Sequence, residues 1–349
     1  MRHKHEDVTA VMDELSELYL SDPDLQSQQR AVAFTRAASV LRSLPRRIKN
    51  SAEVKDVNHI GKGKMPKYIQ EILDTGRLGR LDEMKKNKDL LAQRDLCRVH
   101  GVGPTTASQW VKQGITTVTQ AQTLAEKGEL KGVSEAIRVG LLYYDDVQVP
   151  LSRTEIEGIA GEVREAVWCV AFDRDPKGTV LFEVVGGYRR GKEEGHDVDI
   201  LVSFKRSDGT PGHQGFLEDL TERLRSAGKL VHTFHHGHMG GVNTSNAHQE
   251  SLDVMLGLWD MGSRKCRVDV VQVPPISWPF ALLGWSGNQL FERSIRRYAA
   301  EVLDPSLHLS QKGLSYKATG QPVEATFETE EDIFSYLGLE YIPPHLRFC

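Results

Sequence analysis

The sequence has few cysteines and no long apolar run, and both absences narrow the classes of protein to which it can belong. Its four cysteines lie far apart, which argues against a disulfide framework and against a structural zinc site. No apolar stretch approaches the roughly 18 residues that a membrane-spanning helix needs. The first ten residues, MRHKHEDVTA, lack the apolar core of a signal peptide. We therefore expect a protein of a reducing compartment without a membrane partner.

The chain also lacks a large net charge, since it carries only −4 over 349 residues. A generic polyanion binder would be basic throughout. The charge is uneven, however, because residues 42–98 carry 15 Lys and Arg against 8 Asp and Glu, a local charge of +7. A basic segment in an acidic chain is typical of nucleic-acid binding, although a solvated helical face would give the same count.

The hydrophobic pattern changes near the middle of the chain. Residues 6 to about 145 have the apolar period of helices, as in 27–44, where an apolar stripe ends before Pro45. After Pro150 the pattern predicts helices at 153–167, 214–227 and 289–302 and strands at 179–185, 197–204, 252–259 and 266–273. We predict an α+β fold with a largely β core, and a domain boundary at 143–150.

Two segments of the N-terminal half share one pattern. Residues 57–73 and 97–111 each place a Gly-x-Gly turn between an apolar residue and the start of a helix. Such a turn directs backbone amides at a helix N-terminus toward a phosphate, although many helix pairs need glycines only for steric reasons. Because the two turns bracket the basic segment, we predict helix-hairpin-helix elements that hold the DNA backbone. The residues predicted to contact DNA there are Gly61, Lys62, Gly63, Val99, His100, Gly101, Val102 and Gly103.

The segment 186–204, GGYRRGKEEGHDVDILVSF, concentrates glycine, basic and acidic residues before an apolar strand. Residues i and i+2 of a strand face the same side, so Asp197 and Asp199 point to one place. Two such carboxylates repel each other unless a proton or a cation lies between them, and Mg²⁺ takes carboxylates together with substrate phosphates. An exposed turn with incidental charges is the alternative. The residues predicted to bind a polyphosphate are Gly186, Gly187, Arg189, Arg190 and Lys192.

A third carboxylate would complete a two-metal site, and the sequence offers two candidates. Asp269 lies in the apolar segment 265–273, two residues after Arg267. An isolated Asp in such a strand needs a partner or a metal ion. Asp253 is the alternative on similar grounds, but its neighbours include no basic residue. We therefore predict that Asp269 joins the other two aspartates.

Taken together, these motifs resemble those of the family X DNA polymerases, and most closely the branch of polymerase mu and terminal deoxynucleotidyltransferase. The resemblance covers the chain from about residue 30 to its C-terminus. It rests on AFTRAASVLRSLP (33–45), GGYRRGK and GHDVD (186–199), RVD (267–269), FALLGWSGNQLFER (280–293) and EEDIFSYLGLEYIPP (330–344).

The resemblance implies a palm of the polymerase beta nucleotidyltransferase type with an antiparallel sheet, preceded by an all-α domain with helix-hairpin-helix elements. The implied domains are a lyase-type domain with the first hairpin (1–92), a DNA-binding subdomain with the second hairpin (93–149), the palm (150–279) and a nucleotide-selection subdomain (280–349). A monomer in the nucleus is expected.

A two-metal phosphoryl transfer is implied as well. Asp197 and Asp199 would bridge two Mg²⁺ ions, with Mn²⁺ as a substitute. Asp269 would hold only the catalytic ion and help to activate the primer 3′-hydroxyl, which attacks the α-phosphate of a dNTP and releases pyrophosphate. Gly195, His196, Gly284, Trp285 and Gly287 would also bind the nucleotide, and Arg267 and Arg296 the DNA. A monovalent cation would lie at the second hairpin. The implied partners are gapped or broken DNA ends and end-joining factors.

Departures from the family pattern keep three functions open. The long loop that permits untemplated addition in the mu and transferase branch is reduced here to about 259–266, which favours short-gap filling or end joining over terminal transfer. A non-catalytic DNA-end binder is the third alternative, and the three intact aspartates oppose it, because bare carboxylates weaken binding to phosphates. No BRCT-like domain precedes the first helices in this sequence, either because the sequence is part of a longer chain or because this member lacks one, so recruitment to end-joining factors is left open. The His-rich segment 231–241 is interpreted as a polar loop, with metal binding as the alternative.

Overall fold

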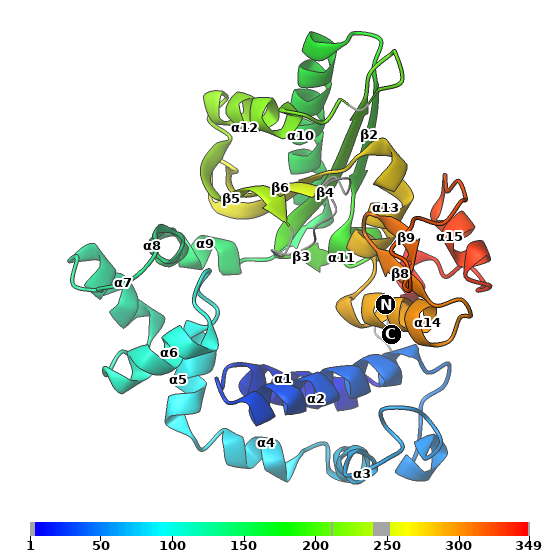
Figure 1. The fold of residues 1–349 in the computed structure, drawn as a ribbon. Helices are drawn as coiled ribbons and strands as arrows, with labels where there is room; N and C mark the ends of the chain where they lie inside the picture. The colour runs from blue at the N-terminus through cyan, green and yellow to red at the C-terminus, as the bar shows by residue number, and fades with distance from the viewer. Residues whose placement is uncertain (1–3, 211, 240–251, 348–349) are drawn as a thin grey trace. The chain divides into compact units, whose positions relative to one another are not determined.

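The computed structural model describes residues 4–210, 212–239 and 252–347, which divide into two compact units (Figure 1). The first unit extends to Tyr144, and the second comprises Asp145–Arg347. This division lies inside the segment 143–150, where the sequence predicts a boundary. Among the described residues, no helix is both long and apolar enough to cross a membrane.

The first unit is helical and has two apolar cores. Its first core lies among α1 (Glu6–Leu20), α2 (Leu25–Ser43), a 3-10 turn (Ser51–Val54), α3 (Met65–Thr75) and α4 (Gly79–Met84). Helix α2 begins where the Asp24 side chain accepts from the Ser27 amide (3.0 Å), and it ends before Pro45. The second core lies among α5 (Lys88–Leu96), α6 (Pro104–Lys112), α7 (Val118–Glu126) and α8 (Glu135–Leu142).

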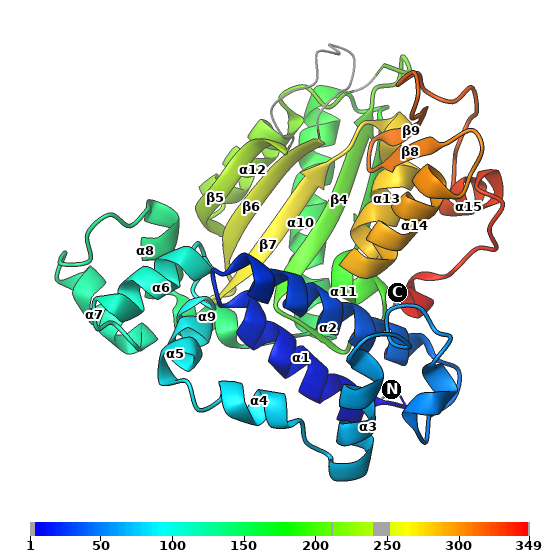
Figure 2. The same cartoon turned by 60° about the horizontal axis from the view of Figure 1, so that its bottom comes forward.

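The second unit is built on a five-stranded sheet. Its strands are β2 (Thr179–Val184), β4 (Asp197–Lys205), β5 (Leu230–Met239), β6 (Leu252–Asp260) and β7 (Lys265–Gln272), in the order β2-β4-β7-β6-β5. Two helices, α10 (Arg153–Arg174) and α12 (Phe216–Ser226), cover one face and bury the apolar residues of alternate strand positions (Figure 2). This arrangement confirms the predicted α+β fold.

Two details of the sheet differ from expectation. The β2–β4, β5–β6 and β6–β7 pairings are antiparallel as expected, but β4 and β7 pair in parallel, because the chain returns through α12 and two further strands between them. The polar-loop interpretation of residues 231–241 is wrong for residues up to 239, which form most of edge strand β5. Residues 240 and 241 lie outside the described residues.

Short elements surround this sheet. Helix α9 (Tyr144–Gln148) leads to β1 (Leu151–Ser152), which pairs with β3 (Glu194–Gly195), and the short helix α11 (Gly186–Arg189) follows β2. The C-terminal part contains a 3-10 turn (Pro275–Ser277), α13 (Trp278–Ser286), α14 (Gln289–Glu301), the hairpin of β8 (Leu307–Ser310) and β9 (Gly313–Tyr316), α15 (Glu330–Tyr336) and a last 3-10 turn (Pro344–Leu346). It has an apolar core of its own.

Candidate active site

Three aspartates meet on the face of the sheet that α10 and α12 leave uncovered. In the parallel register of β4 and β7, Asp199 lies opposite Asp269 and Asp197 lies opposite Arg267. One carboxylate oxygen from each of the three aspartates lies within 4.8 Å of the others. The rival candidate, Asp253, pairs with Gln272. Gln272 is three residues from Asp269, so Asp253 faces the opposite side of the sheet, and the ranking of Asp269 above it is confirmed.

Burial and mutual repulsion raise the pKa values of two of the aspartates, so the cluster binds a proton or a cation more readily than an exposed carboxylate does. Burial, together with the charges of Asp197 and Asp269, raises the pKa of Asp199 to about 7, against the lowering effect of Arg267 and Arg190. Burial also raises the pKa of Asp269 to about 6, against the lowering effect of Arg267. The Arg267 guanidinium lies 2.8 Å from Asp269 and 3.7 Å from Asp197. One arginine neutralises only part of three carboxylates, so the cluster still attracts a proton or a metal ion.

The donor set fits a hard divalent cation. The Oδ1 atom of Asp269 is buried and has no hydrogen-bond partner among the described residues. A buried carboxylate oxygen without a partner is costly unless a cation coordinates it. Carboxylate oxygens are the ligands that Mg²⁺ and Mn²⁺ prefer. The three aspartates can therefore hold a metal ion.

The glycine pair before the strand lets the backbone approach this cluster. Gly186 has a φ of +59°, and a Cβ atom there would lie 1.8 Å from Oδ2 of Asp199. The amide of Val185 donates to the Asp199 carbonyl (2.8 Å), which fixes the start of α11 against β4. A Cβ at Gly187 would lie 3.0 Å from Cδ of Lys192. Glycine is thus required at Gly186 and favoured at Gly187 because other groups occupy the space of a side chain.

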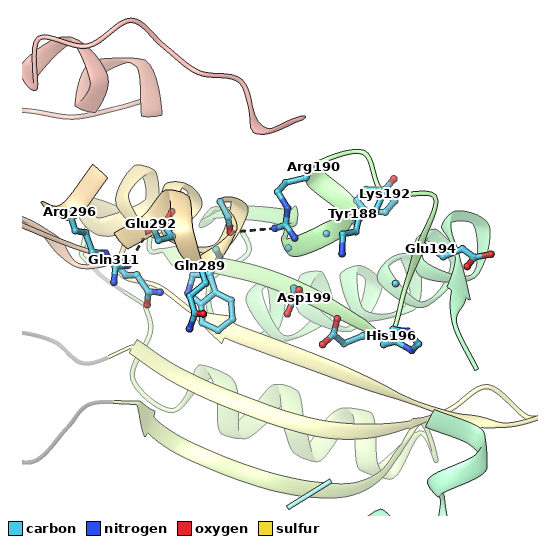
Figure 3. A pocket seen from close by; sticks show the side chains of 17 residues that line it. Tyr188, Arg190, Lys192, Glu194, His196, Asp199, Gln289, Glu292, Arg296 and Gln311 are labelled. Carbon is cyan, nitrogen blue, oxygen red and sulfur yellow. Dashed lines mark hydrogen bonds and ion pairs between the residues drawn. The ribbon is translucent and has the colours of Figure 1, made fainter. Parts of the chain in front are cut away.

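A cleft of about 610 Å³ opens beside the aspartates. It is lined by Asp197, Asp199 and nine of the ten residues predicted to bind the nucleotide, which are Gly186, Gly187, Arg190, Lys192, Gly195, His196, Gly284, Trp285 and Gly287. Figure 3 shows Tyr188, Arg190 and Lys192 on one side of Asp199, and Gln289, Glu292 and Arg296 on the other. Basic side chains on one wall and an acidic floor suit a metal–polyphosphate ligand.

Arg189 is the exception among the predicted ligands. Its guanidinium donates to the Ser286 hydroxyl (2.7 Å) and to Glu330 (2.8 Å), and it does not line the cleft. Glu330 is 2% exposed and also pairs with the fully buried Arg347. We therefore correct its assignment: Arg189 ties α11 to α13 and α15. Arg190, in contrast, lines the cleft and donates to the carbonyl oxygens of Ser286 (3.2 Å) and Gly287 (3.4 Å).

Several lining residues were not predicted. They are Tyr188, Glu194, Gln289, Glu292 and Gln311, and Arg296 was predicted for DNA rather than for this cleft. Gln289, Glu292 and Arg296 follow the spacing of one helix face, which was the available signal. Gln311 belongs to the β8–β9 turn, and a Cβ at Gly284 would lie 2.6 Å from its Cγ. Its presence follows from tertiary packing.

Two buried polar groups complete the wall. Burial raises the pKa of Glu292 to about 7, although Arg296 lies 3.1 Å from it. The Nε1 atom of Trp285 is buried and has no partner among the described residues. Both groups belong to the cleft lining, where a ligand can satisfy them.

The predicted hairpins have the expected local geometry. A Cβ at Gly61 would lie 2.2 Å from the Lys55 carbonyl oxygen, and Gly63 has a φ of +66° shortly before α3. Gly101 has a φ of +84°, and Gly103 is the N-cap of α6. The second turn also packs closely on α8, where a Cβ at Gly140 would lie 2.6 Å from the His100 carbonyl oxygen. Val99 and Val102 are buried, and Lys62 is exposed. Contacts of both turns and of Arg267 with DNA stay predictions.

Comparisons with known proteins match four consecutive segments of the chain. Family models match a helix-hairpin-helix domain at 4–78, the fingers domain of DNA polymerase lambda at 94–148, the DNA polymerase beta palm at 150–274 and the DNA polymerase beta thumb at 281–348.

Two curated relatives match nearly the whole chain. It is 29% identical over 343 residues to the DNA-directed DNA/RNA polymerase mu of Homo sapiens, a match that covers 92% of this chain and 65% of the relative. It is 30% identical over 345 residues to the DNA nucleotidylexotransferase of Xenopus laevis, covering 92% and 64% respectively. The chain thus spans a little under two thirds of the length of these relatives.

Proposed function

Because this chain belongs to the family X DNA polymerases, we propose that it is a DNA polymerase that adds dNTPs to a primer 3′-hydroxyl and releases pyrophosphate. The observation that carries the proposal is the triad of Asp197, Asp199 and Asp269 at a cleft whose opposite wall presents Arg190 and Lys192. Metal ions between acidic and basic groups are the usual requirement of phosphoryl transfer.

Each group of the cleft has a role in this reaction. The three aspartates would hold two Mg²⁺ ions, with Mn²⁺ as a substitute, and such ions stabilise the attacking and leaving oxygens of a phosphoryl transfer. Arg190 and Lys192 supply positive charge toward the triphosphate. Gly186 allows the backbone to approach Asp199, and Arg267 orients the carboxylates of Asp197 and Asp269.

Primer extension tests the proposal with two matched variants. We expect Asp269→Asn to lower single-nucleotide incorporation by at least about a thousandfold while DNA affinity stays the same. Asp253→Asn changes a carboxylate on the opposite face of the same sheet, and its incorporation rate should stay close to that of the wild type. Retained synthesis by Asp269→Asn would refute this reaction centre.

We further propose templated synthesis, in short-gap filling and the joining of broken ends in the nucleus. Strand β6 ends at Asp260 and β7 begins at Lys265, so only a tight turn joins them. Its Gly262 amide donates to Asp260 (2.7 Å), which leaves no long loop to take the place of a template. Similarity to DNA nucleotidylexotransferases supports untemplated terminal transfer as the second candidate.

The two candidates differ in the DNA that they extend. A single-stranded primer and the same primer on a template with a one-nucleotide gap are incubated with Mg²⁺ and all four dNTPs. Templated synthesis predicts addition of the complementary nucleotide on the gapped substrate alone. Extension of the bare primer would favour terminal transfer and would mean that the short turn does not decide template use.

A further inference from the structure

The loop that carries the basic wall of the cleft is held by a segment outside that cleft. Strand β1 precedes α10 and pairs with β3, with Leu151 opposite Gly195 and Ser152 opposite Glu194. Gly195 lies two residues before Asp197, so this pairing fixes the end of the loop beside the triad. Leu151 is fully buried, which anchors β1 in the core of the sheet.

The other end of the loop is held by Arg153, the first residue of α10. Its NH1 atom donates to the carbonyl oxygens of Tyr188 (3.1 Å) and Lys192 (3.0 Å). These two oxygens belong to the residues that flank the turn 189–191, so one guanidinium bridges both sides of the turn. Hydrogen bonds from a charged donor are stronger than those between neutral groups.

Arg153 also contacts the ring of Tyr188, which lines the cleft. Its Cζ atom lies 3.8 Å from the ring centroid, a close cation–π contact. The hydroxyl of the same tyrosine donates to Glu157, one helical turn further along α10 (2.8 Å). The tyrosine is therefore fixed to α10 at its backbone, its ring and its hydroxyl.

The N-terminus of α10 is itself rigidly placed. Ser152 and Glu155 form a reciprocal capping box at the start of the helix. Arg264, from the turn between β6 and β7, donates to Glu155 (3.0 Å) and to the carbonyl oxygens of Val149 (3.0 Å) and Pro150 (3.1 Å). The contacts of Arg153 with the loop therefore come from a helix N-terminus that is itself held in place.

Arg153 adds to two backbone hydrogen bonds within the turn, in which the Gly191 amide donates to the Tyr188 carbonyl (2.9 Å) and the Lys192 amide to the Gly187 carbonyl (3.1 Å). Residues 191–194 are exposed, and no atom lies within 4 Å of a Cβ added at Gly191, so packing does not fix the turn from outside. Figure 3 shows that Arg190 and Lys192 leave this loop on the same side of the cleft. Their distance from each other and from Asp199 depends on the shape of the turn between them.

We propose that Arg153 is a positioning residue for nucleotide binding, which holds the turn 188–192 in the shape that presents Arg190 and Lys192 to the phosphates. This inference rests on the proposed polymerase function. Arg153 does not line the cleft, so it acts through the two carbonyl oxygens and the tyrosine rather than by touching the nucleotide.

Steady-state incorporation and inhibition by pyrophosphate test the proposal together. Arg153→Met keeps an apolar stem against Tyr188 and removes the donors. We expect it to raise the KM for dNTP and the Ki for Mg²⁺–pyrophosphate about tenfold, with kcat and DNA affinity within about twofold of the wild type. Arg164→Ala is the matched control, because Arg164 is also on α10 and lies over an aromatic ring, that of Phe182 (4.7 Å), away from the cleft.

Arg153→Lys separates the guanidinium geometry from the charge. A lysine keeps the charge and one donor nitrogen, but it has no flat guanidinium that lies over the Tyr188 ring while its NH1 atom donates to both carbonyl oxygens, so we expect KM and Ki to stay about threefold raised. Wild-type values in Arg153→Lys would overturn the proposal, as would equal losses in kcat and KM in Arg153→Met. If the wild type incorporates no dNTP, the polymerase proposal fails by itself, and pyrophosphate binding measured by calorimetry still tests the role of Arg153.

Discussion

At the scale of single residues, Gly186 is the glycine of the described chain that leaves the least room for a side chain. Its φ is +59°, and an added Cβ would lie 1.8 Å from the Asp199 carboxylate. A side chain must therefore displace either α11 or the aspartate. We expect Gly186→Ala to lower kcat by about a hundredfold or more, because small displacements of a reacting group have effects of that size. Single-turnover incorporation measures the loss.

Gly228→Ala provides the control for this prediction. Gly228, which follows α12, also has a positive φ, +70°, but no atom lies within 4 Å of its added Cβ. It shares the backbone strain, about 1 kcal/mol, without the collision. If both variants lose activity equally, the requirement for glycine at position 186 comes from backbone strain and not from the space that Asp199 occupies.

Glu292 should make stability depend on pH. Burial raises its pKa to about 7 in the folded protein, whereas an unfolded glutamate titrates near ~4.3. Between these values the folded state binds the extra proton, so the contribution of Glu292 to stability falls as pH rises and is lowest above about 7. We expect Glu292→Gln to become more stable relative to the wild type by about 2–3 kcal/mol between pH 5 and pH 8, because each pH unit in this window changes the difference by up to about 1.4 kcal/mol.

Urea unfolding at the two pH values, with EDTA present, measures this difference. Glu301→Gln is the matched control, since Glu301 lies on the same helix, pairs with Arg297 at 2.7 Å and is 59% exposed at its side chain. It should leave the pH dependence of unfolding unchanged. If the free energy of unfolding changes equally with pH in Glu292→Gln and in the wild type, Glu292 does not have a raised pKa.

At the scale of elements, the sequence predicts a helix or strand well where the residues that determine it are close together in the chain. Strand β4 and the loop before it were predictable because glycines, basic residues and Asp197 and Asp199 are consecutive in sequence. Edge strand β5 was missed because its histidines and glycine mimic the composition of a loop, and its pairing with β6 is irregular at two places. The parallel β4–β7 pairing could not be read from local pattern, because register between strands far apart in sequence is set by the whole sheet.

The same reasoning applies to the residues of the cleft. The sequence identified nine of the predicted nucleotide ligands on its walls because they lie in two short motifs. It misassigned Arg189 because adjacent arginines look equivalent in sequence, whereas the two side chains of Arg189 and Arg190 make different contacts. Arg153 and Gln311 come from separate elements, so only the fold brings them to the loop and the cleft.

Glu330 joins α15 to Arg189 of α11 and to Arg347 near the C-terminus, and its removal should destabilise the protein. Burial alone would raise the pKa of Glu330, but hydrogen bonds from Arg189 and Arg347 outweigh it and hold the pKa below its usual value. Glu330→Gln removes the ion-pair partner of Arg347, which is fully buried. We expect a loss of about 3–5 kcal/mol in the free energy of unfolding at pH 7.

Its pH dependence has the opposite sign to that of Glu292. The stabilisation by ionised Glu330 is fully present above the unfolded pKa and is lost as pH falls through the lower folded pKa. The difference between wild type and Glu330→Gln should therefore shrink below about pH 4. Glu331→Gln changes the exposed neighbour on α15 and should be near neutral in the same urea titration. A constant difference across pH would refute the charge argument.

At the scale of the whole molecule, the net charge has opposite sign in the two parts of the chain. Residues 1–144 carry 23 Lys and Arg against 18 Asp and Glu, whereas residues 145–349 carry 21 against 30. The acidic part contains the triad, which repels DNA unless cations bind to it. Non-specific attraction to DNA is therefore expected to come from the basic helical unit, and the proposed phosphoryl transfer from the acidic one.

The salt dependence of DNA binding tests this separation. Each phosphate contact that is lost reduces the slope of log K against log salt by about 0.9. Lys62 is exposed in the first hairpin and forms no ion pair among the described residues, so Lys62→Ala should lower that slope by about one in titrations with gapped DNA. Lys85, in the same unit, is paired with Glu14 at 2.7 Å, and Lys85→Ala should leave the slope unchanged. Equal slopes for wild type and Lys62→Ala would mean that the first hairpin does not hold the DNA backbone, and the attraction would then have to come from other basic residues of residues 42–98.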